Sequence, residues 1–193
     1  MIRSPCLATL LAALALPLAA QAQTSPDNAA GRTQFEIAGV AQPLCLVGQP
    51  VATSVANARF SADGVSGGTL DIVALSDPET ARGNAAAATI VVPVTCNAAH
   101  DLAIGSSNGG LMRIGGGRAQ IDGFDQFIPY AVQYGWAGRD MAGTSDNTAP
   151  LALSVPHAGK GDLAVAITLD GTSAPLVAGN YEDVLLIEIA AAM

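Results

Sequence analysis

The chain has 193 residues, of which half are hydrophobic and 12% are charged, and its formal net charge is −8. This acidic balance argues against a nucleic-acid-binding protein, because phosphates select basic surfaces. The length suits a single domain whose core is large enough to fold without a metal or a dense disulfide framework.

Residues 1–22 have the pattern of a cleavable secretory signal peptide. Arg3 supplies the positive charge, an apolar stretch follows over 7–19, and Ala20-Gln21-Ala22 forms a small-residue cleavage site. No later segment reaches the roughly 18 apolar residues of a membrane-spanning helix. We therefore expect a secreted chain without a membrane span. Its flexible extension would cover 23–34 and its single domain 35–193.

The first candidate strand runs from Gln34 to Val40 and continues towards Leu46. Along it, Phe35, Ile37, Gly39 and Ala41 share one face, because successive side chains of a strand alternate. Two interpretations stay open. The segment is either the domain's own first strand, with Phe35 and Ile37 in its core, or a strand that pairs with another molecule.

Loss of the signal leaves Cys45 and Cys96. Two cysteines in an oxidising compartment usually pair, so we predict a disulfide between them, with two buried free thiols as the alternative. The bridge would close a loop of about 50 residues, for which chain entropy gives about 4 kcal/mol.

The rest of the chain is predicted to be all-β, with short strands separated by glycine-rich and Asn/Asp-rich turns. The clearest alternation places Leu163, Val165, Ile167 and Leu169 on one face. Seven or eight such strands in a secreted domain indicate an immunoglobulin-like sandwich. The later candidates are 69–75, 89–97, 102–105, 127–134, 151–155, 162–169 and 180–189.

The loops offer little catalytic chemistry. Gly105-Ser106-Ser107-Asn108-Gly109 matches G-x-S-x-G, and Asp140 or Asp146 followed by His157 completes a hydrolase order, yet no helix is predicted after Ser107 to form a nucleophile elbow. A glycine-rich hairpin loop explains the match better.

The sequence also offers no evident metal site. His100 and His157 are expected in surface loops without ligand spacing, and Asp122, Asp125 and Asp140 are expected to be solvated carboxylates rather than a calcium loop. No catalysis, cofactor or metal is therefore expected.

Aromatic residues gather in Phe127 to Trp136, where Tyr130, Val132 and Tyr134 share a face. A core strand explains them better than a glycan-stacking platform. The last candidate strand carries Tyr181, Asp183, Leu185, Ile187 and Ile189 at alternate positions and is followed by no further strand. A sandwich with such an end is expected to need a strand from another chain.

Several motifs together resemble the spore coat protein U-like domain of archaic chaperone/usher pilin subunits. They are Cys45, Cys96 at the end of 91–95, Asp101-Leu102-Ala103-Ile104-Gly105 with Arg113 after it, the tyrosine-bearing strand 129–134, and Ala178-Gly179-Asn180-Tyr181-Glu182-Asp183. The resemblance spans roughly 35–189. The chain departs from the family at 166–171, which lacks the usual aromatic-glycine pair.

The resemblance implies a structural, non-enzymatic subunit of a pilus on the cell surface. A periplasmic chaperone would lend the missing strand, and at an outer-membrane usher the N-terminal strand of a neighbouring pilin subunit would replace it by β-augmentation. Phe35, Ile37, Gly39 and Ala41 would then be the donor face, and the strand from Tyr181 to Ile189 would border the acceptor groove. The alternatives are a self-complete extracellular domain that binds a glycan or protein and, as the least supported, a serine hydrolase.

Overall fold

The computed structural model describes residues 34–64 and 67–192, so the expected signal peptide and most of the flexible extension lie outside the described residues. The described part is all-β and contains no helix. Accordingly, nothing in it is long and apolar enough to cross a membrane as a helix. The chain divides into two units, Met1–Val40 and Ala41–Met193.

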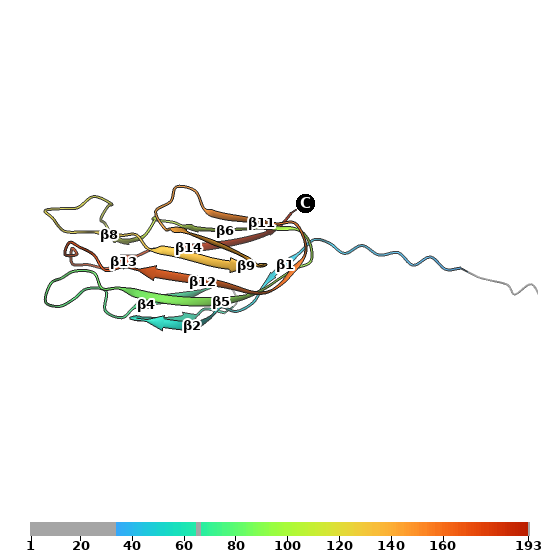
Figure 1. Cartoon of the computed structure of the whole chain (residues 1–193), viewed down its shortest axis with the longest axis horizontal. Helices are drawn as coiled ribbons and strands as arrows, with labels where there is room; N and C mark the ends of the chain where they lie inside the picture. Colours follow the sequence, from blue (N-terminus) through green and yellow to red (C-terminus); the bar gives the residue numbers. More distant parts are fainter. Residues whose placement is uncertain (1–33, 65–66, 193) are drawn as a thin grey trace, which may run out of the picture. The chain divides into compact units, whose positions relative to one another are not determined.

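The second unit holds every described strand (Figure 1). In chain order they are β1 (Cys45–Val47), β2 (Val51–Ala56), β3 (Ala58–Ala62), β4 (Gly68–Ile72), β5 (Ala86–Cys96), β6 (His100–Ser106), β7 (Leu111–Arg113), β8 (Phe127–Ile128), β9 (Ala131–Trp136), β10 (Arg139–Thr144), β11 (Leu151–Val155), β12 (Gly159–Leu169), β13 (Tyr181–Glu182) and β14 (Leu185–Ala191).

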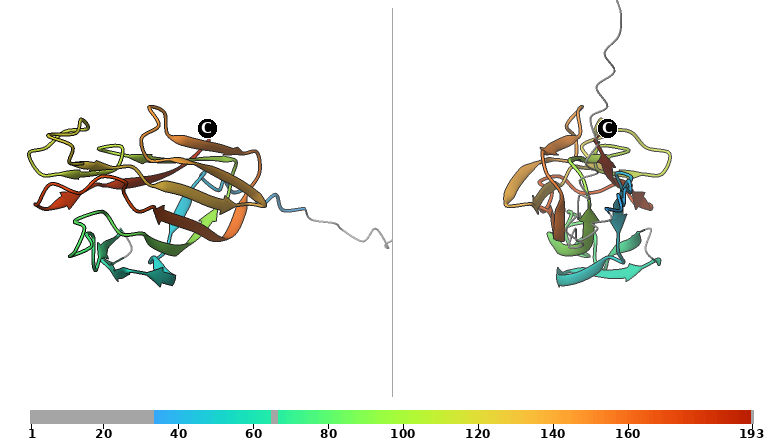
Figure 2. Two further views of the ribbon diagram at one scale, coloured as in Figure 1. Left: turned by 60° about the vertical axis from the view of Figure 1, so that its left-hand side comes forward. Right: turned by 90° about the vertical axis from the view of Figure 1, so that its right-hand side faces the viewer.

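Two antiparallel sheets make up most of this unit. The larger has the order β1-β5-β12-β9-β10, with β2 also paired to β5 beyond the end of β1, and the smaller has the order β11-β6-β14. Strands β13, β7 and β8 form a third small sheet, and β3 pairs with β4. Figure 2 shows the unit from two further directions.

The two larger sheets share one hydrophobic core. The alternation predicted for 162–169 is confirmed in β12, where Leu163, Val165 and Leu169 are buried while Asp162 and Thr168 are exposed. Strand β6 of the smaller sheet contributes buried residues to the same core cluster. A strand with one buried face alternates in this way because its side chains point to opposite sides.

Pro93 explains why two short strands, rather than one long one, lie along the same edge of β5. The Gly48 amide donates to the Pro93 carbonyl (2.7 Å), but proline has no amide hydrogen to return the second bond. Pairing is interrupted there, so β1 ends at Val47 and β2 begins at Val51. The edge opposite β12 is therefore irregular.

Several expected boundaries are corrected. Residues 34–44 contain no strand, so the candidate strand from Gln34 is wrong as secondary structure. The strand expected over 127–134 is broken at Pro129-Tyr130 into β8 and β9. The strand expected over 180–189 is also in two pieces, which places Tyr181 in β13 and Asp183 between β13 and β14.

Candidate functional site

The backbone of β14 is paired on one edge alone among the described residues. Its partner is β6, with Ile187 opposite Ile104 and Ile189 opposite Leu102. The Ser107 amide donates to the Val184 carbonyl (2.9 Å) and the Ala192 amide donates to the Ala99 carbonyl (2.8 Å).

In an antiparallel ladder, every second residue directs both its amide and its carbonyl to the partner strand. The even-numbered residues from Val184 to Ala192 therefore bond to β6. The amides and carbonyls of Leu185, Ile187, Ile189 and Ala191 point to the unpaired edge.

Side chains on the same strand are incompletely covered. Leu185, Ile187 and Ile189 face the core but are half-buried, whereas Ile104, the cross-strand neighbour of Ile187, is 2% exposed. The other edge strand of this sheet, β11, contacts β10 of the larger sheet and buries its core-facing residue Val155. The two sheets are thus covered at one flank and incompletely covered at the other.

The facing sheet has the same defect on the corresponding edge. Val47 pairs with Val94 and Val55 pairs with Ala88, which puts both valines on the core-facing side. They are nevertheless 45% and 48% exposed, while Val94 and Ala88 are buried. Because β1 contacts β14, the two incompletely covered edges lie at the same side of the unit. We call Val47, Val55, Leu185, Ile187 and Ile189 the open flank.

Asp183 lies just before β14 and ties the beginning of this strand to other parts of the unit. Its Oδ1 accepts from the Asn108 amide (2.9 Å) and the Val184 amide (2.8 Å), and its Oδ2 accepts from the Tyr130 hydroxyl (2.7 Å) and the Ser106 hydroxyl. These bonds explain why the expected strand is interrupted here. Burial, and then the bonded Asp183, raise the pKa of Tyr130.

The residues before Asp183 are fixed by a separate set of contacts. The Tyr181 hydroxyl donates to the Val177 carbonyl (2.8 Å), and Arg113 Nε donates to the Ala178 carbonyl (3.0 Å). Gly179 has φ of +151°, and a Cβ there would lie 2.9 Å from Arg113 Nε. The motif Ala178 to Asp183 is therefore a fixed segment, containing β13, that leads into β14.

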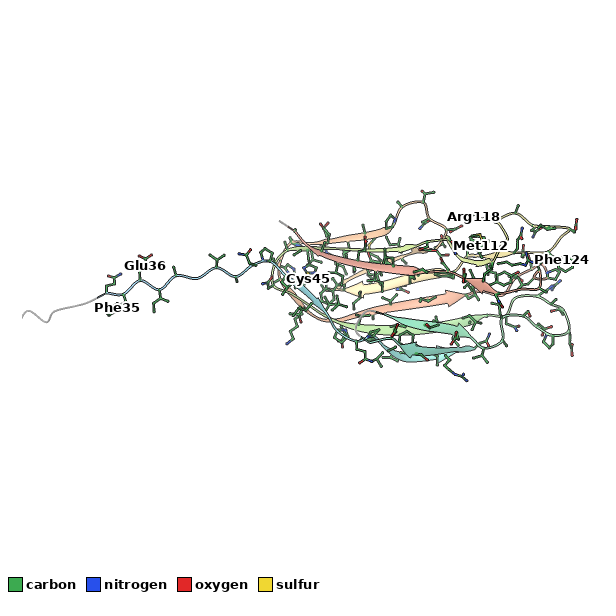
Figure 3. All side chains as sticks on the ribbon, turned by 180° about the vertical axis from the view of Figure 1, so that it is seen from behind. Phe35, Glu36, Cys45, Met112, Arg118 and Phe124 are labelled. Carbon is green, nitrogen blue, oxygen red and sulfur yellow. A yellow bond between two sulfur atoms is a disulfide. The ribbon has the colours of Figure 1, made fainter. Side chains whose placement is uncertain are left out.

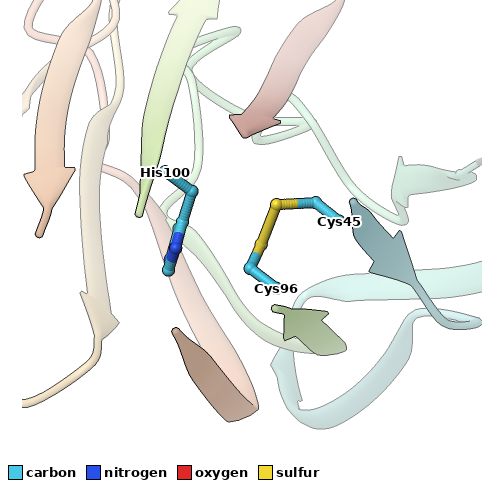
Figure 4. Close-up of side chains that lie close together, drawn as sticks. All are labelled: Cys45, Cys96 and His100. Atoms are coloured by element: carbon cyan, nitrogen blue, oxygen red, sulfur yellow. A yellow bond between two sulfur atoms is a disulfide. The ribbon is translucent and has the colours of Figure 1, made fainter. Parts of the chain in front are cut away.

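The predicted disulfide between Cys45 and Cys96 is confirmed (Figure 4). It lies beside His100, which was expected in a surface loop; that expectation is wrong, because His100 begins β6 and is buried. Its Nε2 accepts from Trp136 Nε1 (2.7 Å), so its Nδ1 carries the hydrogen and donates to the Ala98 carbonyl (3.0 Å). Both ring nitrogens are thus occupied.

These three side chains are also the sole group of at least three potential metal ligands in the described part, with ligand atoms within 4.8 Å of one another. The two sulfurs are joined to each other and both histidine nitrogens are hydrogen-bonded, so none of these atoms is free to bind a metal ion. Asp122, Asp125 and Asp140 are not gathered into such a cluster.

The structure does not bring the candidate hydrolase residues together. Ser107 follows one end of β6, whereas His157 follows Val155, which pairs with His100 at the other end of β6. Seven strand residues separate these ends, or roughly 23 Å. Ser107 and His157 are both exposed, and Ser107 leads into β7 rather than a helix.

The aromatic strand is part of the core. Tyr130, Val132, Tyr134 and Trp136 are all buried, which leaves no stacking platform for a glycan on this strand. Exposed apolar side chains instead occur in the loop between β7 and β8, where Arg118 covers the Phe127 ring at 4.7 Å from its centroid. Figure 3 shows Arg118, Met112 and Phe124 at the opposite end of the unit from Cys45.

The expected donor residues lie before β1 and outside any strand. Phe35 and Ile37 are 82% and 94% exposed, and Gly39 and Ala41 are exposed too. Just after them, the Asn97 side chain holds the chain on both sides of Pro43: the Leu44 amide donates to its Oδ1 (2.7 Å), and its Nδ2 donates to the Gln42 carbonyl (2.8 Å).

Sequence reasoning identified β14 and its alternating face from the apolar pattern, and it singled out Asp183 through the motif. It missed Val47, Val55, Ser106 and Tyr130 as parts of the site, because their roles depend on contacts made across the two sheets. Comparison of the chain with protein-family models, with curated proteins and with solved structures finds no match.

Proposed function

We propose that this chain is a structural subunit of a secreted surface pilus. In this proposal the second unit is an incomplete immunoglobulin-like sandwich, and a strand from another chain completes it at the open flank. The observation that carries the proposal is β14, which combines a row of amides and carbonyls that no described strand pairs with and half-buried Leu185, Ile187 and Ile189 on its core-facing side.

An added strand would satisfy both needs at once. Its backbone would bond to the outward-pointing groups of β14, and its alternate side chains would cover the open flank. When a partly exposed apolar side chain is covered, the complex is stabilised in proportion to the apolar area removed from water, at about 25 cal/mol per Å². Half-buried isoleucines and valines along one flank therefore favour an apolar, alternating partner.

The proposed donor is the N-terminal segment of a second copy or of a neighbouring pilin subunit. Phe35, Ile37, Gly39 and Ala41 would enter the flank, and their exposure in this chain leaves them available. By the resemblance, a periplasmic chaperone would fill the flank first, and assembly would occur at an outer-membrane usher.

Side-chain size is compatible with an antiparallel register between two copies in which two small donor residues meet two large acceptor residues. Gly39 opposite Ile187 and Ala41 opposite Leu185 pair a small residue with a large one. Ile37 then faces Ile189, and Phe35 faces Ala191. A shift of two residues would place Glu36 opposite Glu188, and like charges directly opposite each other are unfavourable.

Cysteine cross-linking tests the proposal and this register together. One copy carries Ala38→Cys and the other carries Glu188→Cys, which are directly opposite in the favoured register. The control pairs Ala38→Cys with Leu186→Cys, which are opposite in the shifted register. We expect a covalent dimer from the first mixture under mild oxidation and a much lower yield from the control. Equal, low yields in both would contradict strand addition at β14 in either of these registers.

A double substitution separates assembly from folding. Phe35→Asp with Ile37→Asp should leave the subunit folded and disulfide-bonded but unable to join another copy, because two charges would enter an apolar flank. The matched control is Gln34→Asp with Val40→Asp, which adds the same charges on the opposite face, away from Glu188 in the favoured register, and should still assemble. If the first variant loses its fold, Phe35 and Ile37 belong to the domain's own core. If the unaltered chain is a stable, non-associating monomer, the self-complete binding domain replaces the pilin proposal.

A further inference from the structure

We propose that Asp183 is a positioning residue that holds the acceptor strand β14 ready before any partner strand arrives. This inference rests on the proposed function and concerns how its site is kept open. Asp183 itself does not touch the incoming strand in this proposal. It acts by fixing the chain directly before β14.

The need for such a residue follows from the position of β14. An internal strand is held by two neighbours, whereas β14 has β6 alone among the described residues. Its core-facing side chains are only half-buried. Segments with few buried contacts and few backbone bonds open most readily in a native protein. Without another restraint, β14 is the strand of this sheet expected to detach first.

The Asp183 carboxylate supplies that restraint from three directions. It accepts from Ser106 at the end of β6, from the Asn108 amide in the following loop, and from the Tyr130 hydroxyl between β8 and β9. It also accepts from the Val184 amide (2.8 Å), the residue directly before β14. Bonds to a carboxylate are stronger than those between neutral groups. One side chain thus connects the beginning of β14 to the end of β6 in the smaller sheet and to Tyr130, the residue before β9 of the larger sheet.

The groups that hold Asp183 are themselves fixed. The Ser106 hydroxyl accepts from the Gly109 amide (2.7 Å) while donating to Asp183. The Gly109 carbonyl accepts from the Ser145 hydroxyl (2.8 Å), which in turn accepts from the Tyr130 amide (2.9 Å). Tyr130 and Ser145 are buried. The bonds close a ring through Asp183, so the carboxylate is placed by the core and not by a mobile loop.

Hydrogen exchange on the isolated chain tests the positioning role without any partner. The amides of Leu186 and Glu188 bond to β6 by the alternation described above, so they report whether β14 stays attached. In Asp183→Asn we expect these two amides to exchange at least about tenfold faster, while the Leu163 and Val165 amides in β12 keep their protection. The matched control is Asp101→Asn, which changes an exposed carboxylate on the same sheet.

Strand capture gives the second readout, with a peptide of residues 34–41 as the probe. We expect Asp183→Asn to slow the association rate about tenfold and to leave the dissociation rate unchanged, because the bound peptide then holds β14 itself. A merely structural residue would alter unfolding without this split between the two rates. Asp101→Asn should match the unaltered chain in both rates.

The outcomes separate the two proposals. Unchanged exchange of Leu186 and Glu188 in Asp183→Asn would overturn the positioning role, even if the peptide binds normally. Faster exchange together with no peptide capture by the unaltered chain would overturn the proposed function and reduce Asp183 to an anchor of an edge strand. If Asp183→Asn does not fold, Tyr130→Phe removes one of the four hydrogen bonds to Asp183 and keeps the aromatic side chain in the core. It should produce a smaller change in the same direction, and no change would count against the proposal.

Discussion

Truncation of two isoleucines that face each other across one strand pair distinguishes an open flank from a closed one. Ile104 and Ile187 are cross-strand neighbours on the core-facing side, but Ile104 is 2% exposed and Ile187 is half-buried. We therefore expect Ile104→Ala to cost much more stability than Ile187→Ala in the isolated chain.

The magnitudes follow from burial. Isoleucine to alanine removes three carbon groups, worth about 0.8 kcal/mol each when fully buried, or about 2.4 kcal/mol in transfer free energy. At Ile104 the cavity left behind adds to this, so the total lies within about 2–5 kcal/mol. At Ile187, which is partly covered, about two thirds of the transfer free energy applies and little closed cavity forms, which gives about 1.5 kcal/mol. Leu186→Ala on the exposed outer face should cost under about 0.5 kcal/mol.

Urea unfolding of the oxidised chain measures these differences, with Trp136 as the single tryptophan and a buried fluorescence probe. With the 34–41 peptide bound, the cost of Ile187→Ala should rise to about 2–3 kcal/mol, because the added strand buries Ile187, whereas the cost of Ile104→Ala should stay the same. Equal costs for the two substitutions in the free chain would show that the flank is already closed and would refute the reasoning.

Three further outcomes are expected. Replacing Cys45 and Cys96 by alanine should lower the free energy of unfolding by about 2–5 kcal/mol, and mass spectrometry of the native chain should find no alkylatable thiol. Burial raises the pKa values of the Tyr130 and Tyr134 hydroxyls above those in the unfolded chain. The free energy of unfolding should therefore be unaffected by these groups below about pH 10 and should fall above it, by up to about 1.4 kcal/mol per pH unit for each tyrosine. Urea unfolding from pH 9 to 11 should show this decline, and Tyr130→Phe should weaken it. Ser107→Ala should change unfolding by under about 0.5 kcal/mol, and a hydrolytic turnover that this substitution abolishes would contradict the structural role.

The elements that could be predicted from the sequence are those whose side chains alternate strongly. Strand β11 (Leu151–Val155) has the expected bounds, and β12 extends the expected 162–169 by three residues at its start. Strands β2, β3 and β10 were missed, because their alanine, serine and charged residues show no clear alternation, and β7 was missed because its three residues are too few to show one. They are strands because their backbones pair with neighbours, and that pairing leaves little trace in local sequence.

Burial that depends on distant contacts could not be predicted. His100 follows Asn97-Ala98-Ala99, which has the composition of a loop, and its burial rests on Trp136, which lies 36 residues further along the chain. Similarly, Val47 and Val55 belong to the open flank because of their register with β5. Local sequence carries the identity of these side chains but not their neighbours.

For the candidate site, the alternation of Leu185, Ile187 and Ile189 predicted a strand with one core-facing side, and the structure has that strand. Tyr181 and Asp183 were expected on the same face of one strand, yet Asp183 is used to end that pairing and to hold the next strand. A carboxylate at an alternating position looks the same in sequence whether it points to solvent or accepts four hydrogen bonds. The contacts with Ser106 and Tyr130 decide between the two.

Differences between the edge strands support the choice of β14 as the acceptor. Natural sheets protect exposed edges with prolines, bulges or charged residues, because an unpaired edge invites another strand. Strand β11 is flanked by Pro150 and Pro156, and β10 begins with Arg139 and Asp140. Strand β14 has none of these devices apart from the outward-facing Glu188, and its inward face is apolar throughout. An edge that carries a single outward-facing charge and is half-covered is a liability in a finished domain, but it is the surface that strand addition requires, and this links the local composition of β14 to assembly.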